Sequence, residues 1–110
     1  MSKAVIKAAQ ILQISNAVLS QVLGVSEATV SRMAREQYLL EQGTKPYELA
    51  QLFVRLFRSL GAVTGSDDVS SRSWLTNANA ALRARPIDLI QTIEGLTRTL
   101  SYVDSRRAPI

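Results

Sequence analysis

The chain has 110 residues, of which 46% are hydrophobic and 20% charged, and it contains no cysteine and no histidine. This length fits one small domain or two lobes around a shared core. The missing residue types exclude disulfides, Cys- or His-ligated metal sites and the commonest general base, so we predict no catalytic residue, no metal and no cofactor. A small enzyme using Ser, Lys, Tyr or carboxylates alone is the alternative, and no motif supports it.

The charge balance is basic and rich in arginine. The net charge is +4 at pH 7, with +1 over residues 1–43 and +3 over residues 44–110, and ten of the thirteen cations are arginine. Arginine favours bidentate contacts with carboxylates and phosphates, so this balance permits nucleic-acid binding without requiring it. The N-terminus lacks a signal-peptide pattern, and no window approaches the ~18 apolar residues of a membrane span. We therefore expect a cytoplasmic protein with no membrane partner.

The first 43 residues predict three short helices. Ser15 is a suitable N-cap for a second helix that ends at Gly24, and Ser26 caps a third that runs to about Glu36. The first helix, over residues 3–13, places apolar side chains on one face at 3.6-residue spacing, namely Val5, Ala8, Ala9 and Leu12.

The middle of the chain predicts two further helices. Residues 46–60 have an apolar surface too wide for one neighbour, so this helix is either central or a subunit interface. We expect residues 61–65, with a glycine at each end, to follow it as a polar loop. A helix over 66–75 begins with Asp67 and Asp68, which we expect to cap it rather than bind a metal, because no third ligand is near.

Two helices complete the chain after a turn-rich stretch over 76–82. One begins at Pro86 and the last follows Thr92, while residues 104–110 are expected to form a short tail. The side chains expected to face inward from these two helices are Ile87, Leu89, Ile90, Ile93, Leu96, Leu100 and Val103.

Residues 16–35 have the pattern of a helix-turn-helix. Such a motif needs a small residue where its two helices cross and a glycine at the turn, and Ser20 and Gly24 supply them. The apolar set that would hold the second helix is Leu19, Leu23, Val25, Val30 and Met33. The string LGVSEATVSR over residues 23–32 resembles the phage-repressor and Xre-type helix-turn-helix family.

The second helix of this motif carries the candidate DNA-binding residues. Arg32 and Arg35 suit guanine or phosphate, whereas Glu27 suits cytosine and would repel phosphate. The alternative is a solvated helix face in which both arginines pair with Glu36 and its neighbours. DNA binding would require a dimer, so that the binding free energies of two weakly bound half-sites add. The predicted contact set is Ser26, Glu27, Ala28, Ser31, Arg32 and Arg35.

The second half resembles the toxin-binding domain of the Xre/MbcA/ParS-type antitoxins. The resemblance rests on an ordered set of residues attached to the helix-turn-helix: Trp74-Leu75, Asn79, Ala81-Leu82, Pro86, Leu89-Ile90, Thr92 and Glu94-Gly95-Leu96. Together with the helix-turn-helix it covers about residues 15–105. We therefore predict an all-α fold in which a helix-turn-helix lobe, residues 1–43, packs with a helical toxin-binding and dimerisation lobe, residues 44–110.

The resemblance implies an antitoxin that binds and occludes a RES-domain toxin, an enzyme that acts on NAD. Its relatives commonly dimerise and repress their own operon, so operator DNA and a second copy are further implied partners. The alternative function is a stand-alone dimeric helix-turn-helix repressor whose second lobe only dimerises.

The resemblance also implies that residues 101–110 lie near the active-site cleft of the toxin. A terminal carboxylate would suit a cationic pyrophosphate pocket, and arginines would suit acidic residues of the pocket; the sequence leaves both open, with plain disorder of the tail as a third interpretation. The predicted toxin-binding residues are Arg83, Arg85, Tyr102, Arg106, Arg107 and Ile110.

The chain departs from the family pattern at two places. Ala78 stands where many relatives have proline, and residues 83–85 replace glycines with Arg-Ala-Arg, which is either a basic patch for the toxin or charge that complements a helix end. Trp74 is expected in the core, and Pro86 and Gly95 are expected to be structural.

Overall fold

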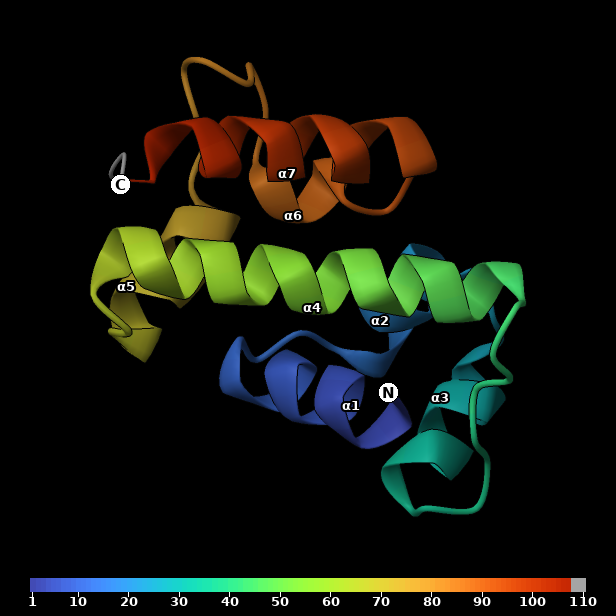
Figure 1. Ribbon diagram of the computed structural model, residues 1–110. Helices are drawn as coiled ribbons and strands as arrows, with labels where there is room; N and C mark the ends of the chain where they lie inside the picture. The colour runs from blue at the N-terminus through green and yellow to red at the C-terminus, as the bar shows by residue number, and fades with distance from the viewer. Residues whose placement is uncertain (108–110) are drawn as a thin grey trace.

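The computed structural model describes residues 1–107, which form helices and no strand (Figure 1). This confirms the predicted all-α fold. Ile110, one of the predicted toxin-binding residues, lies outside the described residues. No helix of residues 1–107 is both long and apolar enough to cross a bilayer. The helices are α1 (Ser2–Ile11), α2 (Asn16–Leu23), α3 (Glu27–Ala34), α4 (Lys45–Thr64), α5 (Asp68–Thr76), α6 (Pro86–Leu89) and α7 (Ile93–Arg106).

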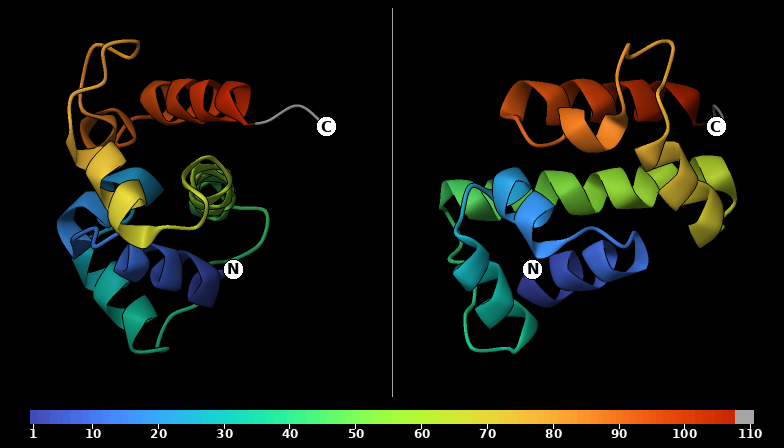
Figure 2. Two further views of the ribbon diagram at one scale, coloured as in Figure 1. Left: turned by 90° about the vertical axis from the view of Figure 1, so that its left-hand side faces the viewer. Right: turned by 180° about the vertical axis from the view of Figure 1, so that it is seen from behind.

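Helix α4 is the centre of the fold. It contacts α1 and α2 on one side and α7 on the other, while α5 packs near its C-terminal end (Figure 1). Two further views agree that α3 and α7 lie on opposite sides of α4 (Figure 2). Residues 46–60, predicted to be either central or a subunit interface, occupy a central position, and both lobes share one hydrophobic core.

The core residues come from every part of the chain. Phe53, Leu56 and Leu60 of α4 are almost completely buried. Burying a side chain of this size stabilises the fold by about 1.5–3 kcal/mol, so the shared helix holds the two lobes together. The other buried apolar residues of the helices beside α4 include Val5, Ala8 and Ala9 of α1, Leu19 and Leu23 of α2, Val30 and Met33 of α3, and Leu96, Leu100 and Val103 of α7.

Most helix boundaries follow the predicted caps. The hydroxyls of Ser15 and Ser26 accept hydrogen bonds from the backbone N–H groups of Val18 and Thr29, at 3.2 and 3.1 Å. The carboxylate of Asp67 accepts from the N–H of Val69 at 3.2 Å, so Asp67 is a helix cap as expected.

The predicted loop over residues 61–65 is wrong, because α4 continues through Gly61 to Thr64. A glycine inside a helix costs only about 1 kcal/mol relative to alanine, and burial of the adjacent Ser59 and Leu60 offsets this cost. The helix ends at Gly65, whose φ of +68° is the left-handed conformation that glycine adopts without strain.

The predicted tail is also partly wrong, because α7 extends through Arg106 and includes Asp104. Contacts between Asp104 and α4, described below, hold this last turn in place. Ile93 is 58% exposed rather than buried, since it lies at the edge of the inward stripe of α7. In α6 and the residue after it, Ile90 is fully buried, whereas Ile87 and Leu89 are half-buried.

Candidate functional site

Helices α2 and α3 form the predicted helix-turn-helix. Gly24 has a φ of +70°, and its N–H and that of Val25 both donate to the carbonyl of Ser20, so the chain turns sharply after α2. Ser20 itself is buried, and its hydroxyl donates to the carbonyl of Ala17 at 2.7 Å. A larger side chain would not fit at this buried position.

The outer face of α3 presents most of the predicted DNA-binding residues. Glu27, Ala28, Arg32 and Arg35 are exposed, and Ser31 is half-buried. Ser26 is also exposed, but its hydroxyl is engaged as the cap of α3 and shares a second hydrogen bond with the hydroxyl of Thr29.

Neither Arg32 nor Arg35, the C-cap residue of α3, pairs with Glu36. Arg32 donates to the hydroxyl of Thr29 and Arg35 to the side-chain carbonyl of Gln37, both at 3.3 Å. Glu36 lies 3.5 Å from the ammonium of Lys3 instead. The pairing that would have neutralised this face is therefore absent within residues 1–107, and both guanidinium groups keep their positive charge toward solvent.

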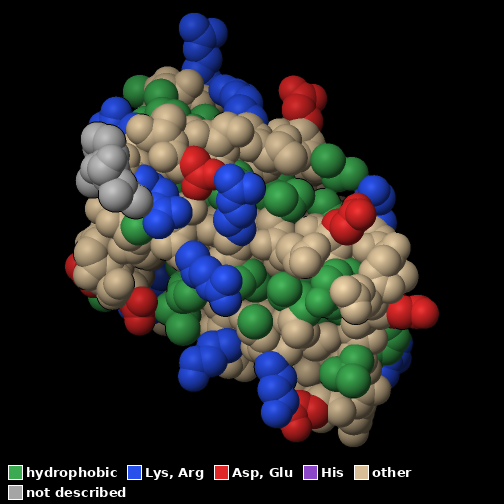
Figure 3. Space-filling model, viewed as in Figure 1, with side chains coloured by type: hydrophobic (Ala, Val, Ile, Leu, Met, Phe, Trp, Pro, Cys, Tyr) green, Lys and Arg blue, Asp and Glu red, His purple; other side chains and the backbone are tan. Residues whose placement is uncertain are grey.

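The charge of the molecule is not concentrated on α3. Lys and Arg side chains extend across the face that presents α4, from the α1 side to the α7 side, with apolar side chains between them (Figure 3). Lys3, Lys7 and Arg58 line one open groove between α1 and α4 on the N-terminal side. The basic excess of the sequence is thus spread over both lobes.

The arginines of residues 83–85 have different environments. Arg85 donates two 3.0 Å hydrogen bonds to the carboxylate of Asp88, which raise the pKa of Arg85 and lower the pKa of Asp88. Arg83 sits at a turn with a φ of +62°, closed by the hydrogen bond from its N–H to the carbonyl of Asn79. The patch therefore holds one arginine with an internal partner and one exposed arginine at a tight turn.

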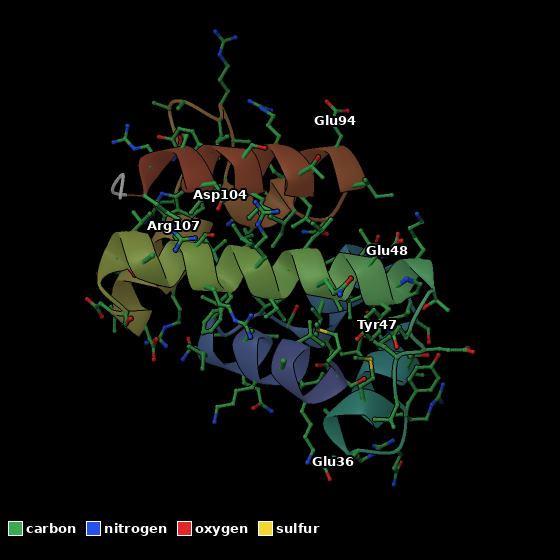
Figure 4. All side chains as sticks on the ribbon, in the orientation of Figure 1. Glu36, Tyr47, Glu48, Glu94, Asp104 and Arg107 are labelled. Atoms are coloured by element: carbon green, nitrogen blue, oxygen red, sulfur yellow. The ribbon has the colours of Figure 1, made fainter. Side chains whose placement is uncertain are left out.

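The C-terminal end of α7 is tied to α4 by polar contacts. Asp104, labelled in Figure 4, lies in the last turn of α7. Its carboxylate accepts hydrogen bonds of 2.6 Å from both Arg55 and Ser59. The hydrogen bond from Ser59 and then that from Arg55 lower the pKa of Asp104. Arg107 donates to the hydroxyl of Ser59 at 3.4 Å, so it joins this network.

Tyr102 and Arg106 belong to a second feature at the same end of α7. The ring of Tyr102 stacks on Trp74 of α5, with centroids 6.4 Å apart and an interplanar angle of 15°. The guanidinium of Arg106 lies over the Tyr102 ring, 6.0 Å from its centroid. Trp74 is half-buried and packs against the core, so the expectation of a core tryptophan holds only for part of its surface.

The sequence did not point to the cavity beside this stack. Leu60, Val63 and Val103 complete a cavity of about 150 Å³ with Trp74, Tyr102 and Arg106. The loop predicted over residues 61–65 gave Val63 no position on a helix face, so the sequence did not indicate that it lines a cavity. The signal was present, however, since Leu56, Leu60 and Val63 continue the 3.6-residue spacing of α4 past Gly61.

Two family models match the chain. Residues 1–55 match the antitoxin Xre-like helix-turn-helix domain, and residues 59–108 match the antitoxin Xre/MbcA/ParS C-terminal toxin-binding domain. The division between the two matches falls within α4, the helix that both lobes share. A search of curated proteins finds no significant match. The helix-turn-helix, the helical second lobe and these two matches show that the chain belongs to the Xre/MbcA/ParS family of antitoxins.

Proposed function

We propose that this antitoxin neutralises a RES-domain toxin that acts on NAD and that it represses its own operon as a homodimer. The proposal assigns DNA binding to residues 1–43 and toxin binding and dimerisation to residues 44–110. Operator DNA and NAD are both cytoplasmic, so we place its action there. The protein acts by occlusion and does no chemistry of its own.

The observation that supports a double role is the position of α4. The exposed face of α3 and the C-terminal end of α7 lie on opposite sides of this helix (Figure 1). DNA bound at α3 would therefore leave the end of α7 open to the toxin, so one chain could bind both partners together.

For DNA binding we propose that α3 enters the major groove. Arg32 and Arg35 contact guanine or phosphate, and Glu27 accepts a hydrogen bond from cytosine. Ala28 and Ser31 lie on the approaching surface, and Ser26 keeps the N-terminus of α3 formed. Because residues 1–43 carry a net charge of only +1, we expect each half-site to bind weakly and a dimer to be needed.

For toxin binding we propose contacts from the turn that holds Arg83 and Arg85 and from the end of α7, with Tyr102, Arg106 and Arg107. Arg85 and Arg107 already have internal partners, so a toxin carboxylate would compete with Asp88 or Ser59 for them. We include Ile110 among the proposed contacts. The truncation described in the Discussion tests whether residues 108–110 or the arginines enter the active site.

The direct test is co-expression with the protein encoded next to the chain. We expect the neighbour to stop growth when expressed alone, and the chain to restore growth and co-purify with it. A neighbour that is harmless alone and does not co-purify would favour the stand-alone repressor, in which the second lobe only dimerises.

A further inference from the structure

A partly enclosed cavity lies beside the Trp74–Tyr102 stack, on the toxin-binding side of the chain. Its walls come from three helices: Leu60 and Val63 of α4, Trp74 of α5, and Tyr102, Val103 and Arg106 of α7. All of these residues lie within the match to the toxin-binding domain, residues 59–108. Its volume of about 150 Å³ suits a single apolar side chain rather than a cofactor, since ligand pockets usually measure about 300–1,000 Å³.

The two aromatic rings of the cavity are incompletely covered by their own chain. Trp74 and Tyr102 are both half-buried, and Val63 at the rim is 41% exposed. Aromatic pairs held by neighbouring helices lose little conformational freedom when a partner covers them. Trp, Tyr and Arg are also the residues that most often dominate the binding energy of protein interfaces. The lining of this cavity therefore has the composition of an interface anchor.

The charge at the rim indicates what the partner presents. Arg106 lies over the Tyr102 ring, is exposed, and forms no ion pair with any carboxylate of residues 1–107. No acidic residue lines the cavity. An apolar side chain followed or preceded by a carboxylate would fill the cavity and pair with this guanidinium.

A second copy of the chain fits this surface poorly. A two-fold dimer through the cavity would place the same patch of both copies face to face. The Arg106 side chains of both copies would then meet at the interface, and the lining offers no carboxylate to offset their repulsion. A toxin with an acidic edge has no such conflict.

We propose that this cavity is the anchor site for the toxin, and that it takes one aliphatic or aromatic side chain with a neighbouring carboxylate. This inference rests on the proposed function but adds to it, because it assigns the affinity for the toxin and the blocking of the toxin's active site to different residues. The anchor at Val63, Trp74 and Tyr102 supplies binding energy, whereas the groups that enter the active site of the toxin lie elsewhere.

The test compares two variants with matched controls, using a catalytically inactive form of the toxin encoded next to the chain as the probe. Val63→Asp places a charge at the rim of the cavity, and Ile93→Asp makes the same change at an exposed apolar site at the other end of α7. Arg106→Glu reverses the charge at the rim, and Arg58→Glu makes the same change at an exposed arginine of α4 that does not line this cavity. The readout is the Kd by calorimetry, with a thermal melt of each variant alone.

We expect Val63→Asp and Arg106→Glu each to raise the Kd about 30-fold or more, the equivalent of about 2 kcal/mol, and the two controls to raise it less than about threefold. Equal Kd values for the wild type, Val63→Asp and Arg106→Glu would overturn the anchor site and leave the antitoxin function intact. No binding by the wild type would overturn the proposed function itself. A wild-type dimer that Val63→Asp splits into monomers would overturn the anchor site in favour of a second copy. If Val63→Asp lowers the melting temperature, Arg106→Glu decides alone, because Arg106 is exposed.

Discussion

Asp104 in the last turn of α7 accepts a 2.6 Å hydrogen bond from Arg55 in the middle of α4. The same carboxylate accepts a second 2.6 Å bond from Ser59, one turn further along α4. Figure 4 shows Asp104 and Arg107 together on this side of the two helices. Residues that the sequence predicted as a tail therefore belong to the contact that fixes α7 on the shared helix.

The first prediction concerns this contact. Asp104→Asn should lower the free energy of unfolding at pH 7 by about 1 kcal/mol, a modest value because Arg55 is 62% exposed and water screens the pair. The pKa of Asp104 is lowered in the folded chain. The ionised carboxylate therefore stabilises the fold above the ordinary aspartate pKa of about 3.9, and this stabilisation is lost as the pH falls below that value. Urea unfolding at pH 7 and at pH 3 measures this. The difference between variant and wild type should shrink at the lower pH; an equal difference at both would contradict the role of the charge.

The second prediction uses two glycines. A Cβ on Gly95 would lie 1.9 Å from the carbonyl oxygen of Leu89, which is backbone that moves only with the whole α6–α7 turn. Gly95→Ala should therefore destabilise the fold by about 2–3 kcal/mol. A Cβ on Gly61 would meet nothing within 4 Å, so Gly61→Ala should stabilise α4 by about 0.5–1 kcal/mol. Thermal unfolding of both variants checks the opposite signs, and a stable Gly95→Ala protein would refute the close approach of α7 to α6.

The third prediction concerns Thr99. Its side chain is fully buried in α7, and its hydroxyl has no hydrogen-bond partner among residues 1–107. Thr99→Val keeps the shape and removes the unpaired group, so we expect a gain of about 1 kcal/mol in the free energy of unfolding. Thr97→Val is the control, because Thr97 is exposed and its hydroxyl donates to the carbonyls of Ile93 and Glu94. A loss of stability in Thr99→Val would show that the hydroxyl has a partner in the folded protein.

The fourth prediction separates the two lobes. If Arg32 and Arg35 contact bases, Arg32→Ala and Arg35→Ala should each weaken operator binding by about 1–3 kcal/mol. If the two arginines contact phosphate, each variant should weaken binding to all DNA sequences equally and reduce the salt dependence of binding. Neutralisation of the toxin should stay unchanged, because α3 and α7 lie on opposite sides of α4. Gel-shift titrations at two salt concentrations and a growth-rescue assay measure both effects. Loss of rescue in either variant would show that the lobes do not act separately.

The fifth prediction concerns the end of the chain. Removing residues 108–110 leaves the Asp104 network and Tyr102 in place, so the truncated protein should melt like the wild type. If residues 108–110 carry the occluding group, the truncated protein should still bind the toxin but protect poorly against it. Full protection by the truncated protein would assign occlusion to Arg107 instead, since Arg106 lies at the proposed anchor site.

The sequence predicted the local structure of the N-terminal lobe best. Ser15, Gly24 and Ser26 carry enough local signal to place both helices of the helix-turn-helix, because caps and left-handed turns depend on neighbouring residues. It failed at Gly61, where burial of Ser59 and Leu60 against other helices overrides the low helix propensity of glycine. Tertiary packing decides such positions.

The candidate toxin-binding surface was predicted less well for the same reason. Tyr102 and Trp74 are 28 positions apart, and only the packing of α5 against α7 beside the end of α4 brings their rings together. The pairing of Arg85 with Asp88 is local, by contrast, since Arg85 is the N-cap of α6 and Asp88 lies three residues later in its first turn, but the sequence analysis did not predict it.

The most direct test of toxin neutralisation measures NAD in a reaction of the purified toxin with increasing amounts of the purified chain. We expect NAD consumption to stop when the chain reaches a fixed stoichiometric ratio to the toxin, and we expect the Arg32→Ala variant to stop it equally well. Undiminished NAD consumption in the presence of excess folded chain would contradict the antitoxin mechanism proposed here.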